Sequence, residues 1–157
     1  MSLAYSVIRA LDGRTIATAE SCTGGGIGAV LTAIPGSSSV YKGGVVSYTN
    51  EVKMRLLNVS ADALDRFGAV SAEVAEAMAL GVRNTLRTDV AVSVTGLAGP
   101  GGDDRGTAVG TVYIGYSDTN KTLSHKYCFD GDREFVRQEA IKAALQLILD
   151  ENAAKQQ

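Results

Sequence analysis

Short apolar runs and stripes of apolar residues at helical spacing alternate along this chain. Runs rich in Val, Ile, Thr and Tyr predict strands, and these cover 15–19, 40–48, 89–95, 109–116 and 122–129. Apolar residues three and four apart predict helices, which cover 3–11, 24–34, 61–67, 72–87 and about 132–151, with a short helical turn near 54–57. The alternation predicts an α/β fold with three α/β/α layers and a mostly parallel mixed sheet that contains one antiparallel strand.

Two local signals refine these elements. Ser60 and Ser71 stand just before two predicted helices, where a side-chain oxygen can accept a hydrogen bond from a free backbone N–H. The pair Gly43-Gly44 interrupts the strand at 40–48, which indicates a bulge or a close approach of another backbone.

Composition fits one globular domain over 1–157, with a polar tail at 152–157 that we expect to be frayed. Net charge is -2 without a basic block, so nucleic acid is not an expected partner. No apolar run reaches transmembrane length, so we expect no membrane contact. Cys22 and Cys128 do not make a disulfide framework, which favours a cytoplasmic location. His125 is the single histidine, so we expect a metal-free mechanism with another base.

Three loops follow predicted strands, at 20–26, 48–53 and 95–106. Ligands of such sheets bind outside the carboxyl ends of the strands. Ser21 lies where a strand turns into a helix, with three glycines behind it. Such a turn can expose a hydroxyl and aim free backbone N–H groups at the same place. The alternative is a tight turn whose Ser and Thr merely cap the helix.

A serine is a weak nucleophile until a base accepts its proton. Lys53 and Tyr48 are the candidates beside Ser21, because they lie five residues apart just past a strand end. A lysine serves as a base only when burial or a neighbouring cation lowers its pKa. Otherwise Lys53 is a solvated charge and Tyr48 a strand-end aromatic. Cys22 is a rival nucleophile near a helix N-terminus, although a small buried thiol is its favoured role.

The glycine-rich loop 95–106 has the backbone to hold a phosphate or to form an oxyanion hole. It lacks the Gly-Lys-Ser/Thr ending of a Walker A loop, and it is not a dinucleotide-binding fingerprint. Arg105, Arg133 and Arg137 could grip a phosphate as a fork. Equally, Arg133 and Arg137 could pair with acidic neighbours on an exposed helix face.

Several motifs stand in one order along the chain: AESCTGG at 19–25, PGSS at 35–38, GGVVSYTNEVK at 43–53, GAVS at 68–71, TGLAGPGG at 95–102 and GTVY at 110–113. Together they closely resemble the CinA C-terminal domain family, the nicotinamide-nucleotide amidohydrolases. The resemblance extends from about residue 3 to residue 150.

This resemblance implies deamidation of nicotinamide mononucleotide, a small-molecule pyridine nucleotide, to nicotinate mononucleotide and ammonia in pyridine nucleotide salvage, without a cofactor. It implies a nucleophile at Ser21, with Tyr48 and Lys53 as activating residues. We expect backbone N–H groups near 22–25 or 95–97 to hold the oxyanion. The expected substrate-binding residues are Cys22, Thr23, Gly24, Gly25, Thr95, Gly96, Gly99 and Arg105.

The chain departs from the family pattern at Thr107-Ala108, where many relatives carry Lys-Pro. Any contact that a lysine makes there is therefore not expected here. Many relatives also carry this domain behind a larger N-terminal domain with nucleotide pyrophosphatase activity. We therefore do not expect pyrophosphatase activity from residues 1–157.

Two other functions stay open at this stage. A metal-dependent nucleotide phosphohydrolase or transferase would use Asp103 and Asp104 as metal ligands and would not need Ser21. A regulatory module would bind a nucleotide without turnover. The sequence leaves open whether the chain forms a homo-oligomer.

Overall fold

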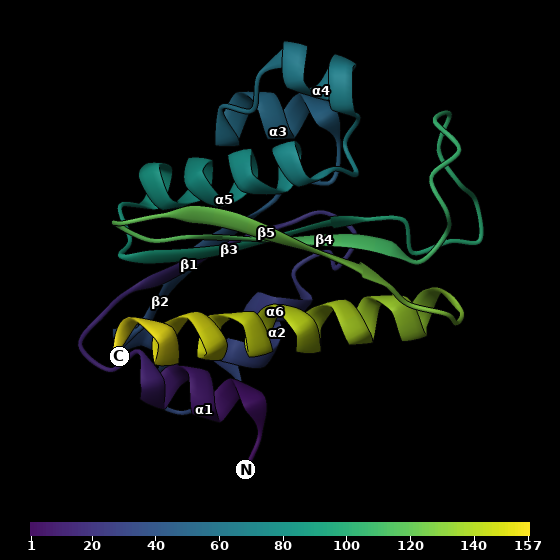
Figure 1. The fold of residues 1–157 in the computed structure, drawn as a ribbon. Helices are drawn as coiled ribbons and strands as arrows, with labels where there is room; N and C mark the ends of the chain where they lie inside the picture. Colours follow the sequence, from purple (N-terminus) through teal and green to yellow (C-terminus); the bar gives the residue numbers. More distant parts are fainter.

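A five-stranded sheet runs through the middle of the protein in the computed structural model, which describes all residues from 1 to 157 (Figure 1). The strands are β1 (Ile16–Glu20), β2 (Tyr41–Val46), β3 (Val90–Gly96), β4 (Thr111–Ser117) and β5 (Thr122–Cys128). They stand in the order β2-β1-β3-β4-β5. β2, β1 and β3 are parallel, and β4 runs antiparallel to its neighbours β3 and β5. The predicted mixed sheet with one antiparallel strand is therefore confirmed.

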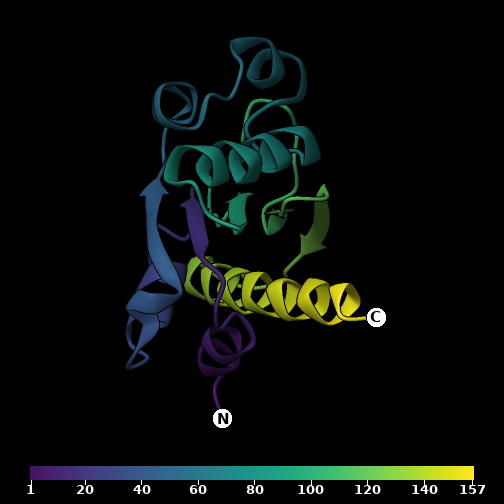
Figure 2. The ribbon, with the colours of Figure 1, turned by 90° about the vertical axis from the view of Figure 1, so that its left-hand side faces the viewer.

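Helices cover both faces of this sheet (Figures 1 and 2). One face carries α2 (Gly26–Thr32) and α6 (Arg133–Lys155), and α1 (Leu3–Ala10) packs against α6. The other face carries α5 (Ala72–Leu86), with α3 (Asn50–Leu57) and α4 (Ala61–Phe67) on its outer side. A short 3₁₀ helix, η1 (Ser37–Ser39), precedes β2. The three predicted α/β/α layers are confirmed.

The core forms two clusters, one on each face of the sheet. The larger cluster has 23 buried residues and involves α1, α2 and α6, and the smaller has 9 and involves α5. α5 contributes Val74, Met78 and Val82, which are fully buried and four residues apart, as a helix that packs on a sheet requires. β3 is buried along almost its whole length, as expected for a central strand.

The predicted helix caps and the predicted bulge are both present in the structure. Ser60 and Ser71 accept hydrogen bonds from backbone N–H groups in the first turns of α4 and α5. The register between β1 and β2 shifts beside Gly43, which is the predicted bulge. A Cβ atom on Gly44 would lie 2.2 Å from Thr18 Oγ1, so only glycine permits this close packing of β2 on β1.

The C-terminal helix continues beyond its predicted end. We expected a frayed tail from Asn152, but α6 runs to Lys155. The Asn152 side chain is buried and accepts a hydrogen bond from Arg14, near the end of α1. This contact between distant parts of the chain stabilises the last turn of α6, which is rich in polar residues.

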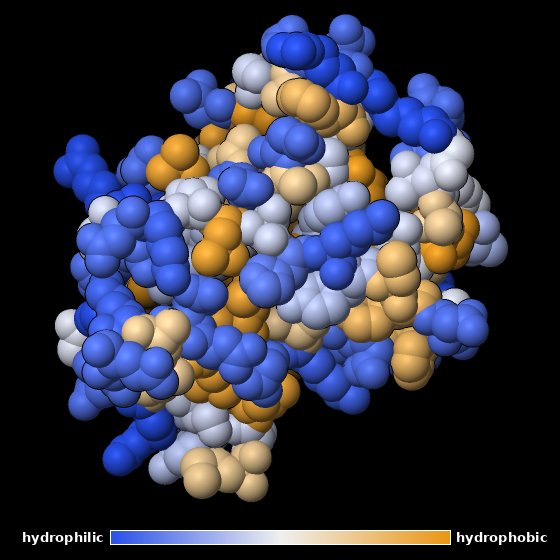
Figure 3. All heavy atoms as spheres, in the orientation of Figure 1, coloured by the Kyte–Doolittle hydropathy of each residue, from blue (hydrophilic) through white to orange (hydrophobic).

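Hydrophilic residues cover much of the face drawn in Figure 3, and hydrophobic residues appear between them as separate patches. None of the helices combines the length and the apolar character needed to cross a bilayer.

Candidate active site

The carboxyl ends of β1, β2 and β3 meet at one edge of the sheet, beside a cleft of about 620 Å³. Parts of α3, α4, the 95–105 loop and the first residue of α6 complete its walls. Of the predicted site residues, the cleft is lined by Ser21, Cys22, Tyr48, Lys53, Thr95, Gly96, Gly99 and Arg105. Thr23, Gly24 and Gly25 do not line it.

Lys53 lies against Ser21 at the bottom of this cleft. Its Nζ donates to Ser21 Oγ at 3.1 Å and to the Ser47 carbonyl oxygen at 2.7 Å, and the Tyr48 carbonyl oxygen is 3.5 Å away. Thr49 places the lysine, because its hydroxyl caps α3 and starts the helix at Asn50. The predicted short turn near 54–57 is therefore a full helix. Its first turns carry Lys53 into the interior.

Burial changes the acid–base behaviour of Lys53. Only 1% of the residue is exposed to solvent. Removal of water from the ammonium group lowers the pKa of Lys53 from its ordinary value of 10.5 to about 8. A substantial fraction of the side chain is therefore neutral near physiological pH, as a general base requires.

The turn that presents Ser21 is held from inside by Glu20. This buried carboxylate accepts hydrogen bonds from the Thr23 hydroxyl (2.7 Å) and from the N–H groups of Ile27 (2.8 Å) and Gly28 (3.1 Å). Glu20 thus occupies the positive end of α2, which we had expected to be available to a ligand. Thr23 serves this internal network and not the cleft.

Arg137 holds the same turn from outside. From α6 its Nε donates to the Cys22 carbonyl oxygen (3.0 Å) and its Nη2 to the Thr23 carbonyl oxygen (3.2 Å). The backbone N–H groups of Cys22 and Thr23 donate to no other group of the protein. Of these two residues only Cys22 lines the cleft, so its N–H is the donor directly after Ser21 that a ligand can reach. The sequence suggested a phosphate contact or an ion pair with an acidic neighbour for Arg137, because a contact across 115 residues leaves no local pattern.

Cys22 has the expected role of a small buried thiol. Only 5% of it is exposed, and burial raises the pKa of the Cys22 thiol to about 11. The thiol is therefore protonated at neutral pH and is a poor nucleophile.

Tyr48 lines the cleft, but its hydroxyl contacts neither Ser21 nor Lys53. The side chain is 57% exposed, and its hydroxyl accepts a hydrogen bond from Arg133 Nη2 at 3.0 Å. Arg133 Nη1 donates to the Gly99 carbonyl oxygen at 2.8 Å. The structure thus contains a direct contact between Lys53 and Ser21, and the Tyr48 hydroxyl bonds to Arg133 instead.

Arg105 and Asp103 are engaged within the protein. The Arg105 guanidinium donates to the carbonyl oxygens of Leu64, Asp65 and Arg66, at the C-terminal end of α4. Asp103 accepts hydrogen bonds from the hydroxyl and N–H of Thr107 and from the N–H of Arg105. These bonds, the Thr107 hydroxyl above all, lower the pKa of Asp103. Both side chains thus shape the glycine-rich loop.

The remaining loop residues are placed by β3 and its neighbours. Thr95 is buried, and its hydroxyl donates to the Ala69 carbonyl oxygen at 2.7 Å. A Cβ atom on Gly96 would lie 2.7 Å from the Val112 side chain. Asp104 is exposed, and no group of three or more His, Cys, Asp or Glu side chains is arranged to hold a metal ion.

Comparison with solved structures shows that this architecture recurs. The competence damage-inducible protein A from Klebsiella pneumoniae is similar with a TM-score of 0.94 and 38% identity, over 99% of this chain and 97% of that one. A competence-damaged protein (CinA) superfamily protein from Escherichia coli is similar with a TM-score of 0.91 and 35% identity, over 94% and 87%.

Sequence comparison gives the same family. The CinA-like protein of Thermosynechococcus vestitus is 49% identical over 152 residues, which cover 94% of this chain and 36% of that relative. The chain thus spans about a third of the length of the curated relatives it matches. The model of the CinA C-terminal domain matches residues 2–152. The chain therefore belongs to the CinA C-terminal domain family.

Proposed function

We propose that the protein is an amidohydrolase that converts nicotinamide mononucleotide to nicotinate mononucleotide and ammonia. The observation that carries this proposal is the buried Lys53 Nζ, 3.1 Å from Ser21 Oγ, in a cleft at the carboxyl edge of the sheet. Membership of the CinA C-terminal domain family and the motifs around Ser21, Tyr48 and Lys53 support the choice of substrate. A cleft of about 620 Å³ falls within the usual range for small-molecule sites, about 300–1,000 Å³.

Lys53 is arranged to act as the base for Ser21. A neutral amine has two N–H donors and one lone pair, whereas an ammonium has three donors. The carbonyl oxygens of Ser47 and Tyr48 are placed to accept the two N–H donors. The lone pair is then directed at the Ser21 hydroxyl, whose proton it accepts as Oγ attacks.

The proposed reaction proceeds in two halves. Ser21 Oγ bonds to the carboxamide carbon, and the N–H of Cys22 stabilises the oxyanion. The Lys53 ammonium then returns its proton to the leaving nitrogen, so that ammonia departs and an acyl-enzyme remains. Water, deprotonated by Lys53, attacks this ester. Cleavage of the bond to Oγ gives the carboxylate product, and Ser21 recovers its proton.

Ammonia release from nicotinamide mononucleotide tests the proposal, with wild type and Ser21→Ala compared with and without EDTA. We expect turnover by the wild type that EDTA does not change, and a loss of at least about 1,000-fold in Ser21→Ala. Turnover retained in Ser21→Ala would remove the serine from the mechanism.

Two other results would favour the alternatives. Release of inorganic phosphate in place of ammonia, abolished by EDTA and restored by Mg²⁺, would favour the metal-dependent phosphohydrolase. Nucleotide binding by the wild type without ammonia release would favour a regulatory module.

A further inference from the structure

The glycine-rich loop forms one wall of the cleft, and α4 forms a neighbouring wall. The loop leaves the sheet after β3, extends to the side of the sheet where α3, α4 and α5 lie, and returns at β4 (Figure 1). The cleft is lined from the loop by Gly99, Gly101, Asp103, Asp104 and Arg105, and from α4 and the turn after it by Ala61, Leu64, Asp65 and Gly68. The separation of these two segments therefore sets the width of this part of the cleft.

Few hydrogen bonds hold the tip of this loop, residues 100–107. Within the tip, Asp103 accepts hydrogen bonds from the N–H groups of Arg105 and Thr107 and from the Thr107 hydroxyl. None of these bonds reaches outside the tip. Every hydrogen bond from the tip to the rest of the protein comes from one side chain, that of Arg105. The polar contacts of this wall with the rest of the protein therefore depend on a single residue.

Arg105 reaches from the loop to the C-terminal end of α4. Its Nη1 donates to the Arg66 carbonyl oxygen at 3.3 Å, and its Nη2 donates to the carbonyl oxygens of Asp65 and, at 3.5 Å, Leu64. The last carbonyl groups of a helix carry a partial negative charge, so they attract a guanidinium. Gly68 ends α4, and a Cβ atom on it would lie 2.7 Å from Arg105 Cδ and Nε. The missing side chain of Gly68 thus leaves room for the arginine.

The contact between Arg105 and α4 is arranged so that it can open. Arg105 is exposed, and water can replace the carbonyl oxygens as partners of its guanidinium. Gly99 and Gly106, near the two ends of the tip, have φ angles of +87° and +74°. Because glycine adopts both signs of φ at little cost, these positions can serve as hinges. A cleft wall between two hinges, held by one exposed contact, has the parts of a latched lid.

We propose that residues 100–107 form a lid of the cleft and that Arg105 is the latch that holds the lid against α4. Arg105 is a positioning residue, because it acts on the site through the loop. With the latch closed, the lid narrows the cleft around a bound molecule. With the latch open, substrate enters and product leaves. The identity of the bound molecule rests on the proposed function, but opening of the lid in the free protein does not.

Proteolysis of the free protein tests the latch. Asp-N endoproteinase cleaves before aspartate, so it can cut the lid before Asp103 and Asp104 and does not recognise Arg105 itself. In Arg105→Met we expect cleavage of the lid to be about 3- to 10-fold faster, since cleavage follows the population of the open form. Arg105→Lys should restore part of the protection, because an ammonium can donate to the same carbonyl oxygens. Cleavage before Asp130, an exposed site outside the lid, is the internal reference and should not change.

Arg66→Met is the matched control. The Arg66 side chain pairs with Asp62 on the exposed surface of α4 and does not line the cleft. Its replacement leaves in place the Arg66 carbonyl oxygen that accepts from Arg105. Cleavage of the lid should therefore be as slow as in the wild type. Unchanged cleavage of the lid in Arg105→Met would overturn the latch, because the loop would then be held without Arg105.

Dissociation rates test the lid. Ser21→Ala and Ser21→Ala/Arg105→Met are compared by stopped flow, so that no turnover interferes. We expect loss of the latch to raise the dissociation rates of nicotinamide mononucleotide and of nicotinamide riboside by the same factor, about 3- to 10-fold, because the lid closes over either molecule. Faster cleavage of the loop with unchanged dissociation would overturn the lid.

The two molecules also separate the lid from direct recognition. A faster dissociation of nicotinamide mononucleotide alone would overturn the proposal, since Arg105 would then bind the phosphate that the riboside lacks. Failure of the proposed function would be visible separately, as absence of ammonia release by the wild type, while the proteolysis of the free protein would still decide whether Arg105 is a latch.

Discussion

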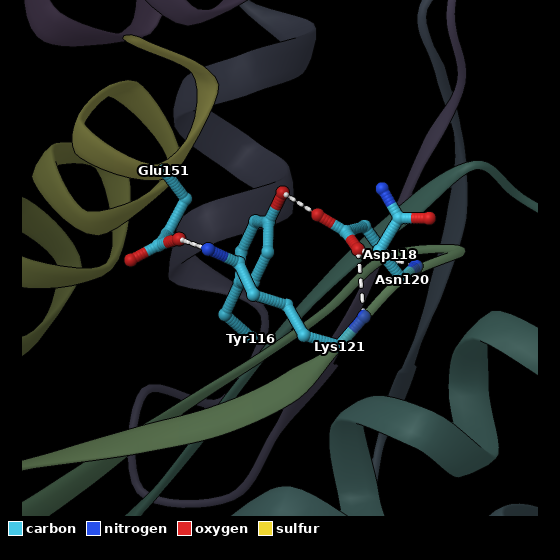
Figure 4. Close-up of polar contacts among 5 residues, drawn as sticks. All are labelled: Tyr116, Asp118, Asn120, Lys121 and Glu151. Carbon is cyan, nitrogen blue, oxygen red and sulfur yellow. Dashed lines mark hydrogen bonds and ion pairs between the residues drawn. The ribbon is translucent and has the colours of Figure 1, made fainter. Parts of the chain in front are cut away.

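Two polar clusters lie at opposite ends of the sheet, and they differ in what burial does to their charges. One is the Ser21–Lys53 pair at the carboxyl end of β1. The other surrounds Tyr116 at the end of β4 (Figure 4). Ser117 pairs with Ala91 at the start of β3, which places this second cluster at the amino edge of the parallel strands.

Each polar group in the Tyr116 cluster has a matched partner. The buried Tyr116 hydroxyl donates to Asp118 at 2.9 Å, and Asp118 also accepts from the N–H groups of Asn120 (2.8 Å) and Lys121 (3.0 Å). The Lys121 ammonium forms an ion pair with Glu151 of α6. The cluster thereby fastens the β4–β5 turn to α6, and none of its members lines the cleft.

The pKa shifts separate the two clusters. Burial, with the Asp118 charge, raises the pKa of Tyr116, and the hydrogen bond to Glu151 raises the pKa of Lys121. Burial alone would raise the pKa of Asp118, but its hydrogen bonds outweigh burial and lower it. All three groups are thus held more firmly in their ordinary protonation states.

Lys53 shifts in the opposite direction. No carboxylate contacts its Nζ, so burial lowers the pKa of Lys53 toward neutrality. In the proposed mechanism the Lys53 amine, buried without a counter-ion beside the Ser21 hydroxyl, accepts a proton from that hydroxyl. The Tyr116 cluster, whose charges are paired and which lies outside the cleft, stabilises the fold instead.

Among changes around the two clusters, replacement of Lys53 should give the largest effect. Lys53→Met keeps the length of the side chain and removes the amine, so kcat for ammonia release is expected to fall by at least about 100-fold. Lys42→Met, at an exposed position of β2, is the control and should leave kcat unchanged. Substantial activity in Lys53→Met would mean that another group accepts the Ser21 proton.

A smaller effect is expected when the Ser21 turn loses its outer support. Arg137→Met should lower kcat about 10-fold with little change in KM, because the Cys22 N–H loses its fixed direction while the cleft remains. Arg137→Lys should recover part of kcat, since an ammonium can still donate to a carbonyl oxygen. A change in KM alone would assign Arg137 to substrate binding instead.

The smallest effect should come from the paired cluster, and it should affect stability rather than activity. Tyr116→Phe removes one buried hydrogen bond and is expected to lower the free energy of unfolding by about 1 kcal/mol. Denaturant unfolding measures this loss, and ammonia release should be unchanged. A parallel fall in kcat/KM would show that the two ends of the sheet are coupled.

Local sequence pattern predicted the fold well where the cause is local. Ser60 and Ser71 cap helices in the folded protein because a hydroxyl satisfies N–H groups three residues away. The end of α6 was predicted too early, because the contact that holds Asn152 comes from Arg14, near the other end of the chain. Thr49 was the available signal for the full length of α3, since it is a typical N-cap residue.

The candidate site was also predictable only where a local pattern marks it. Ser21, Tyr48 and Lys53 follow strand ends, and the order of strands brings such ends together. The roles of Glu20 and Arg137 depend on which atoms face them in three dimensions. A buried carboxylate under a helix and an arginine that binds two carbonyl oxygens have no spacing that a sequence reveals.

The pH dependence of kcat/KM for nicotinamide mononucleotide tests the central claim most directly. The free enzyme must contain neutral Lys53, so kcat/KM should rise about tenfold per pH unit below about pH 8 and level off above it. Protonation below this pKa removes the base, which sets the sign of the dependence. A profile that is flat, or that levels off near pH 6.5 as expected for an ordinary histidine, would contradict a Ser21–Lys53 pair.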